Sequence, residues 1–104
     1  MRLIVFFDLP TGTKEERKAA TAFRNFLIKD GYYMIQFSVY GRLCNGNDHV
    51  EKHCARVRQN APEYGSVRML TVTEKQYASI RIIAGAKSPR EKPAKFIQTA
   101  FLLD

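Results

Sequence analysis

The chain opens with an unbroken apolar run from Leu3 to Phe7, which ends at Asp8 and a Pro-Thr-Gly turn. β-Branched and aromatic residues in so short a run predict a β-strand. Side chains alternate along a strand, so Leu3 and Phe7 face one way and Asp8 faces the other. Both faces of this strand are mainly apolar, and we therefore expect both to be covered in the folded protein.

A helix is predicted after the turn. Thr13 and Glu16 have the spacing of a capping box, and Gly31 is a typical residue just beyond a helix end. Between them the apolar positions recur at the helical period and define one buried stripe. The stripe consists of Ala20, Phe23, Phe26 and Leu27.

A second helix is predicted from about Asp48, which has the capping-box spacing with Glu51, to the helix-breaking Pro62. Its apolar stripe is narrow. His49 and His53 lie four residues apart and could in principle share a metal ion. The sequence shows no third ligand beside them, so we interpret both as histidines at or near the surface.

Three further segments read as strands: 33–40, 65–73 and a short one at 80–85, with a loop at 41–46 and a one-turn helix at 74–77. Right-handed crossovers put both helices on one face of an antiparallel sheet and make the first strand and segment 65–73 central neighbours. The predicted fold class is therefore α+β, a ferredoxin-like βαββαβ sandwich whose other face is open.

The C-terminal part of the sequence differs in composition from the rest. Residues 87–95 are basic and contain two prolines, which is typical of a solvated linker that could also follow a phosphate backbone. The apolar segment 96–104 should be an added strand or an anchor on a partner. We therefore divide the chain into a domain at 1–86 and a linker with tail at 87–104. A two-fold homodimer would cover the open face and pair each tail with the partner's sheet.

Charge points to a polyanionic partner, although a merely soluble basic protein is the plain alternative. Seventeen Lys and Arg against ten Asp and Glu give a net charge of +7, which suits phosphate contacts made without sequence choice. The candidate nucleic-acid-binding residues are Lys14, Arg17, Lys18, Arg24, Lys52, Arg56, Arg58, Lys87, Arg90 and Lys92.

Other classes of site and location have little support in the sequence. Cys44 and Cys54 do not form a CxxC pair, and we expect reduced thiols rather than a zinc site or a disulfide. No apolar run is long enough to span a bilayer, and the N-terminal residues do not resemble a signal peptide. We therefore expect a cytoplasmic protein with no membrane partner.

Three features together resemble a known family: the strand ending in Phe6-Phe7-Asp8-Leu9-Pro10, Arg17 early in the first helix, and the segment Gln36-Phe37-Ser38-Val39-Tyr40. They are similar to the small CRISPR-associated adaptation proteins, the second of the two proteins shared by most such systems, also described as CRISPR-associated endoribonucleases. The resemblance covers essentially the whole length. The tail resembles the versions from Cas9-type (type II) systems.

The resemblance implies a metal-dependent endonuclease that acts on phosphodiester bonds. Asp8 would hold Mg²⁺, or alternatively Mn²⁺, together with the Asp8 of a dimer mate. Arg17 would stabilise developing charge, and Phe37 and Ser38 would position the backbone or the metal loop. From the residues alone, a turn former before Pro10 explains Asp8 better than a metal ligand does, and the resemblance makes the two explanations about equal.

The resemblance also implies a role that needs no catalysis. A homodimer would carry duplex DNA and bridge two dimers of an integrase partner during spacer acquisition in antiviral defence. We favour this role. The alternative is endonuclease activity on RNA or DNA, for which Asp8 would be essential. A second alternative is a ferredoxin-like RNA-binding module that uses its open sheet face for stacking.

Overall fold

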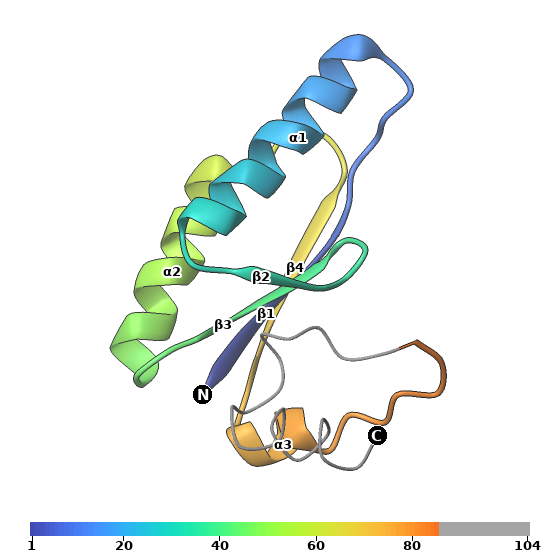
Figure 1. Cartoon of the computed structure of the whole chain (residues 1–104). Coiled ribbons are helices and arrows are strands. Elements are labelled where there is room, and N and C mark those ends of the chain that lie inside the picture. The colour runs from blue at the N-terminus through green and yellow to red at the C-terminus, as the bar shows by residue number, and fades with distance from the viewer. Residues whose placement is uncertain (86–104) are drawn as a thin grey trace.

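A computed structural model describes residues 1–85, which fold into a four-stranded sheet and three helices (Figure 1). The predicted basic linker and C-terminal strand lie outside the described residues. In chain order the elements are β1 (Arg2–Asp8), α1 (Lys14–Lys29), β2 (Tyr33–Gln36), β3 (Val39–Leu43), α2 (Asn47–Asn60), β4 (Ser66–Val72) and α3 (Glu74–Ala78). The βαββαβ order and the ferredoxin-like class are confirmed.

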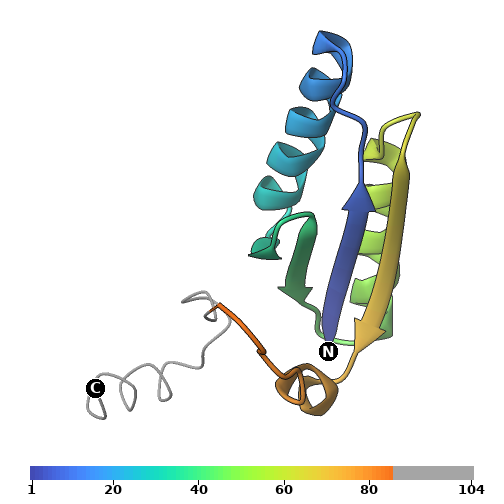
Figure 2. The same ribbon diagram turned by 90° about the vertical axis from the view of Figure 1, so that its right-hand side faces the viewer.

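The sheet is antiparallel throughout, with the order β2-β3-β1-β4, and α1 and α2 cover the same face (Figures 1 and 2). β1 and β4 are neighbours, as expected, and pair from Arg2 opposite Val72 to Asp8 opposite Ser66. In the part of the chain that the structure describes, β4 is an edge strand, so its predicted central position was wrong. The strand that opens the sequence is thus an inner strand of the sheet.

The core lies between this sheet and the two long helices. Leu3 and Val5 of β1 are completely buried, and they belong to one cluster with Phe23 and Leu27 of α1 and Val57 of α2. The predicted stripe of α1 faces this cluster because 3.6 residues per turn bring positions 20, 23 and 27 to one side. Burial of these side chains fixes which face of β1 points toward the helices.

The other face of β1 is only partly covered. Ile4 is buried, but Phe6 is 39% exposed, and Leu70, which neighbours Ile4 across the β1–β4 pair, is 51% exposed. On the same face Arg2 forms an ion pair with Glu74 of α3, at 2.9 Å between Arg2 Nε and Glu74 Oε2. Its guanidinium lies 4.3 Å from the centre of the Tyr77 ring. The short helix α3 therefore docks at the start of β1 and leaves Phe6 and Leu70 uncovered.

Segment 33–40 was predicted as one strand, and this was wrong. It forms β2 and the beginning of β3, which pair with each other through a turn at Phe37 and Ser38. Ser38 takes a left-handed backbone conformation with φ of 63°, which reverses the chain. The alternating pattern continues on both sides of the turn, so periodicity alone did not reveal the hairpin. The predicted loop at 41–46 consequently begins with the last residues of β3.

Two further predictions need correction. Segment 80–85 does not form a strand, although Ile80 and Ile83 gave it an apolar pattern, and both side chains are exposed. The first turn of α2 has no side-chain cap, because the helix is preceded by Gly46 rather than capped by Asp48. By contrast, the capping box of Thr13 is present in α1.

Candidate functional site

The end of β1 and the β2–β3 turn meet at a hollow of about 340 Å³, here called the Asp8 hollow. Asp8 is exposed there, and the Phe7 amide donates a 3.0 Å hydrogen bond to the Ser38 carbonyl. That bond holds Phe37 and Ser38 next to the strand end. The structure thus brings together three of the four residues that the resemblance assigned to catalysis.

The fourth residue, Arg17, lines an adjoining hollow of about 290 Å³, here called the Arg17 hollow. Arg24 lines it too, and Phe37 and Ser38 lie between the two hollows because they line both. Arg17 Nη1 donates to the carbonyl oxygens of Thr11 and Gly12, at 3.1 and 3.4 Å. These bonds tie the guanidinium to the loop after β1, so it lies in the Arg17 hollow rather than the Asp8 hollow.

Arg68 also lines the Asp8 hollow, and the sequence analysis missed it. It lies on β4, two residues after Ser66, which is the cross-strand neighbour of Asp8. Antiparallel pairing of β1 with β4 puts Arg68 and Asp8 on the same face of the sheet. The alternation of side chains along β4 could have predicted this position if the register of β4 with β1 had been known.

A divalent-metal site is not complete in one chain. Residues 1–85 contain no cluster of three or more His, Cys, Asp or Glu side chains that could hold an ion. Asp8 is the one carboxylate that lines its hollow. Mg²⁺ requires octahedral oxygen ligation, so the side chains of a single chain do not fit it without ligands from elsewhere.

Most of the predicted phosphate-contacting residues that the structure describes are exposed on the two long helices. Arg56 is a partial exception, because its Nη2 lies 2.9 Å from Oδ1 of the buried Asp30 and its side chain is 47% exposed. The other exposed residues of this set are Lys14, Arg17, Lys18 and Arg24 on α1, and Lys52 and Arg58 on α2. Lys87, Arg90 and Lys92 lie outside the described residues.

The interpretation of His53 as a surface residue was wrong. Its side chain is 5% exposed, and its Nδ1 lies 2.7 Å from Asp30 Oδ2. The Asn45 amide donates to His49 Nδ1 at 3.0 Å, so a neutral His49 carries its proton on Nε2. That proton is donated to His53 Nε2, 3.0 Å away, and His53 in turn donates its Nδ1 proton to Asp30. Pairing with a buried carboxylate explains the burial.

This chain of hydrogen bonds does not fit a shared metal ion. A metal on His49 Nε2 would move the proton to Nδ1, where it would oppose the Asn45 N–H group. Desolvation and the neighbouring His53 lower the pKa of His49, which favours the neutral form that this arrangement needs. The prediction that the two histidines do not bind a metal stays a prediction, now with a geometric reason.

The two cysteines are free, as expected. Cys44 is buried and Cys54 half-buried, and burial raises the pKa of both thiols. A raised pKa makes the reactive thiolate scarce, so neither residue is suited to nucleophilic chemistry. In the described part of the chain, none of the helices has the length and apolar composition needed to cross a membrane.

The fold and the site together define a small, basic ferredoxin-like domain with a carboxylate at the end of its first strand. Comparison with known sequences gives the family. The profile of the family described as "CRISPR associated protein Cas2" matches residues 1–80. The chain belongs to this family, which confirms the resemblance seen in the sequence.

Individual relatives support the same assignment. A protein of Acidovorax ebreus (strain TPSY), named "CRISPR-associated endoribonuclease Cas2", is 54% identical over 100 residues, which are 96% of this chain and 98% of that protein. One of the same name from Streptococcus mutans (strain ATCC 700610 / UA159) is 46% identical, over 84% of this chain and 80% of its own length. The crystal structure of Streptococcus pyogenes Cas2 at pH 6.5 matches with a TM-score of 0.61 at 22% identity. The match covers 81% of this chain and 100% of that chain, and it supports the assignment of the fold.

Proposed function

We propose that the chain is a CRISPR adaptation protein whose homodimer binds duplex DNA without sequence preference and bridges dimers of an integrase partner. The observation that carries this proposal is the Arg17 hollow, which Arg17 and Arg24 line and which has no carboxylate among its lining residues. Lys14 and Lys18 add charge on the same helix, and the chain carries +7 overall. A cationic surface of this kind favours phosphate contacts, which give affinity without reading the base sequence.

Duplex binding tests the DNA-binding half of the proposal. The affinity of the wild type should fall steeply with salt, because each phosphate contact releases counterions. The double variant Arg17→Ala/Arg24→Ala should bind more weakly and lower the logarithmic salt slope by about two per subunit. Lys75→Ala on α3 is the matched control and should bind as the wild type. A flat salt response of the wild type would exclude phosphate-led binding.

A spacer-acquisition assay separates scaffold from enzyme. We expect Asp8→Ala to retain acquisition and truncation after Lys95 to abolish it, since the scaffold requires docking tails but not a metal ligand. Loss of acquisition with Asp8→Ala at normal protein level would instead assign catalysis to the biological role.

The second candidate function is a metal-dependent endonuclease with Mg²⁺, or Mn²⁺, between paired Asp8 residues of a dimer. The names of the relatives favour it, as does the exposed Asp8 beside Arg68 in one hollow. When bound, the ion would activate a water and polarise a phosphodiester, while Arg68 would balance the phosphate charge. The substrate would be RNA or DNA.

The RNA-binding alternative relies on the open sheet face. Phe6 is an exposed aromatic residue there, but Leu70 and Leu43 on the same face are aliphatic and exposed. Aliphatic side chains do not stack on bases as aromatic ones do. The composition of the face supports pairing with another apolar surface better than base stacking.

A further inference from the structure

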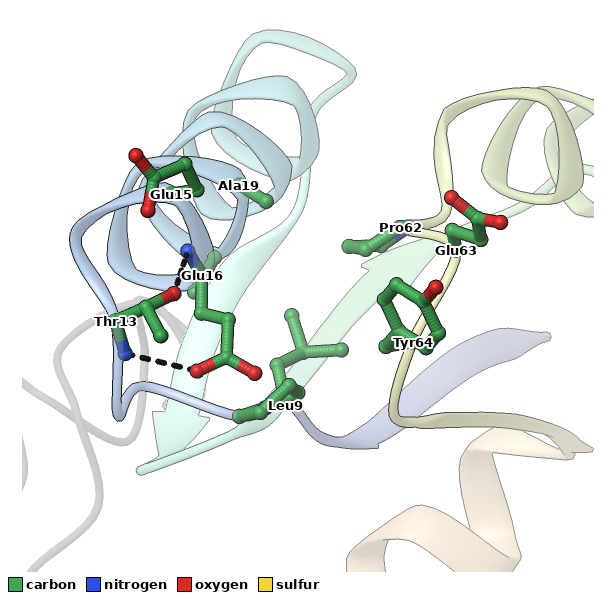
Figure 3. A pocket seen from close by; sticks show the side chains of 10 residues that line it. Leu9, Thr13, Glu15, Glu16, Ala19, Pro62, Glu63 and Tyr64 are labelled. Atoms are coloured by element: carbon green, nitrogen blue, oxygen red, sulfur yellow. Dashed lines mark hydrogen bonds between the residues drawn. The ribbon is translucent and has the colours of Figure 1, made fainter.

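An apolar recess of about 450 Å³ forms a groove between the start of α1 and the segment after α2. We call it the acidic groove because three glutamates line it. Figure 3 shows Leu9 at its base, with Ala19 on the α1 side and Pro62 and Tyr64 opposite. Tyr64 is 68% exposed, although its ring forms one wall. The groove is therefore an open apolar surface rather than part of the core.

The backbone directly after Tyr64 passes close to the end of β1. Gly65 has φ of 100°, and a Cβ atom there would lie 2.7 Å from the carbonyl oxygen of Asp8. Only glycine fits so close an approach without strain. Gly65 therefore allows the segment that carries Tyr64 to lie against the end of β1.

Carboxylates line this groove in a protein of net charge +7. Glu15, Glu16 and Glu63 surround the apolar base, and among residues 1–85 no Lys or Arg lines it (Figure 3). Glu16 accepts a hydrogen bond from the Thr13 amide, at 2.8 Å. Within residues 1–85 no ion pair engages Glu15 or Glu63. The negative charge at the rim is thus left available to a partner.

The groove and the Arg17 hollow lie on two sides of the same helix. Both are lined by Leu9 and Ala20, but one carries only carboxylates and the other only guanidinium groups as charged side chains. Phosphate would be repelled by the first and attracted by the second. The start of α1 therefore separates a surface suited to a cationic partner from one suited to nucleic acid.

From this geometry we infer that the acidic groove is a docking site for a protein segment that presents an apolar side chain flanked by Lys or Arg. The apolar side chain would fill the recess between Ala19 and Tyr64, and the flanking cations would meet Glu15 and Glu63. Charge complementarity of this kind governs the rate and specificity of association. The inference rests on the proposed bridging function, because the acidic groove would be the surface of this chain to which the integrase partner binds.

The test measures binding of the purified integrase partner to the full-length homodimer. Glu15→Gln/Glu63→Gln should weaken binding about tenfold at moderate salt, mainly through a slower association rate. Ala19→Arg, which keeps a good helix former at an exposed position, should block the recess and weaken binding at least as strongly. Glu51→Gln on α2 is the matched control and should bind as the wild type.

Duplex affinity of the same variants separates this inference from the proposed function. We expect none of them to bind the duplex more weakly than the wild type, since the altered residues lie outside the Arg17 hollow and each change makes the chain more positive. Integrase binding that is unchanged in both groove variants would overturn the inference and leave the bridging function standing. A change in sedimentation alone, without a change in integrase binding, would make the groove a contact between copies of this chain and would also overturn it. Absence of integrase binding by the wild type would overturn both.

Discussion

The Nδ1 atom of His53 in α2 lies 2.7 Å from Oδ2 of Asp30, the residue that ends α1, and both side chains are almost completely buried. A carboxylate at a helix C-terminus opposes the helix dipole, and a buried carboxylate needs partners. Asp30 has them in His53 and Arg56. This pair therefore joins the two long helices through a polar contact at the edge of an otherwise apolar core.

The histidine pair predicts how stability depends on pH. The pKa of His49 is lowered in the folded state by desolvation and by His53, while the unfolded chain takes up a proton near pH 6.5. The unfolded state therefore binds more protons as the pH falls below about 6.5, and the free energy of unfolding decreases there. Urea denaturation of the wild type from about pH 7.5 down to about pH 5.5 should show this loss.

His49→Gln is the informative variant for that measurement. His49→Gln removes the imidazole whose pKa is lowered in the folded state, so the pH profile should become flatter. A variant with the same steep profile as the wild type would show that His49 is not the source.

Tyr32 carries the one buried side-chain polar atom in residues 1–85 that has no hydrogen-bond partner, its hydroxyl group. Burial raises the pKa of Tyr32, so the hydroxyl stays neutral at all ordinary pH values. Tyr32→Phe removes an unpaired polar group and keeps the ring, and the free energy of unfolding should stay equal or rise by about 1 kcal/mol. Tyr33→Phe is the control. Its hydroxyl lies 3.2 Å from that of Tyr77 and within reach of Arg2, so its loss should destabilise the protein.

The uncovered sheet face predicts a dimer. Phe6 and Leu70 are both more than a third exposed on the side of β1 away from the long helices. Sedimentation of the wild type at micromolar concentration should give a dimer, and Leu70→Lys should shift it toward monomer because it puts a charge into the apolar contact. Ile28→Lys, at an exposed position on α1, should leave the dimer intact. A monomeric wild type would contradict the proposed assembly.

Asp8 predicts the outcome of a nuclease assay. If the protein cleaves nucleic acid with Mg²⁺, Asp8→Ala should reduce the rate by at least about a hundredfold, since a metal ligand is lost. Duplex binding should remain, because Asp8 does not line the Arg17 hollow. Glu51→Gln serves as a control for the change of charge. Cleavage that persists in the Asp8 variant would place the activity elsewhere in the chain or in a contaminant.

Sequence periodicity was sufficient for the elements that bury one regular face. The stripe of α1, its capping box at Thr13, and β1 and β4 follow from the spacing of apolar residues and from local capping. The same reasoning failed for segment 33–40, where a turn at Ser38 interrupts two strands without interrupting the pattern. It also failed for 80–85, where apolar residues without a strand to pair with remain outside the sheet.

The candidate site shows the same division. The sequence by itself determined the charge of the chain, its fold class and the presence of Asp8 at a strand end, because these depend on composition and short-range pattern. Only the tertiary structure decided which residues accompany Asp8, since the registers of β1 with β4 and of β2 with β3 bring Arg68 and Ser38 beside it. It also decided that His53 is buried against Asp30, because that contact joins two residues that lie 23 positions apart in the sequence. The local sequence pattern carries no information on contacts between residues so far apart in the sequence. The packing of α1 and α2 onto one face of the sheet determines these contacts.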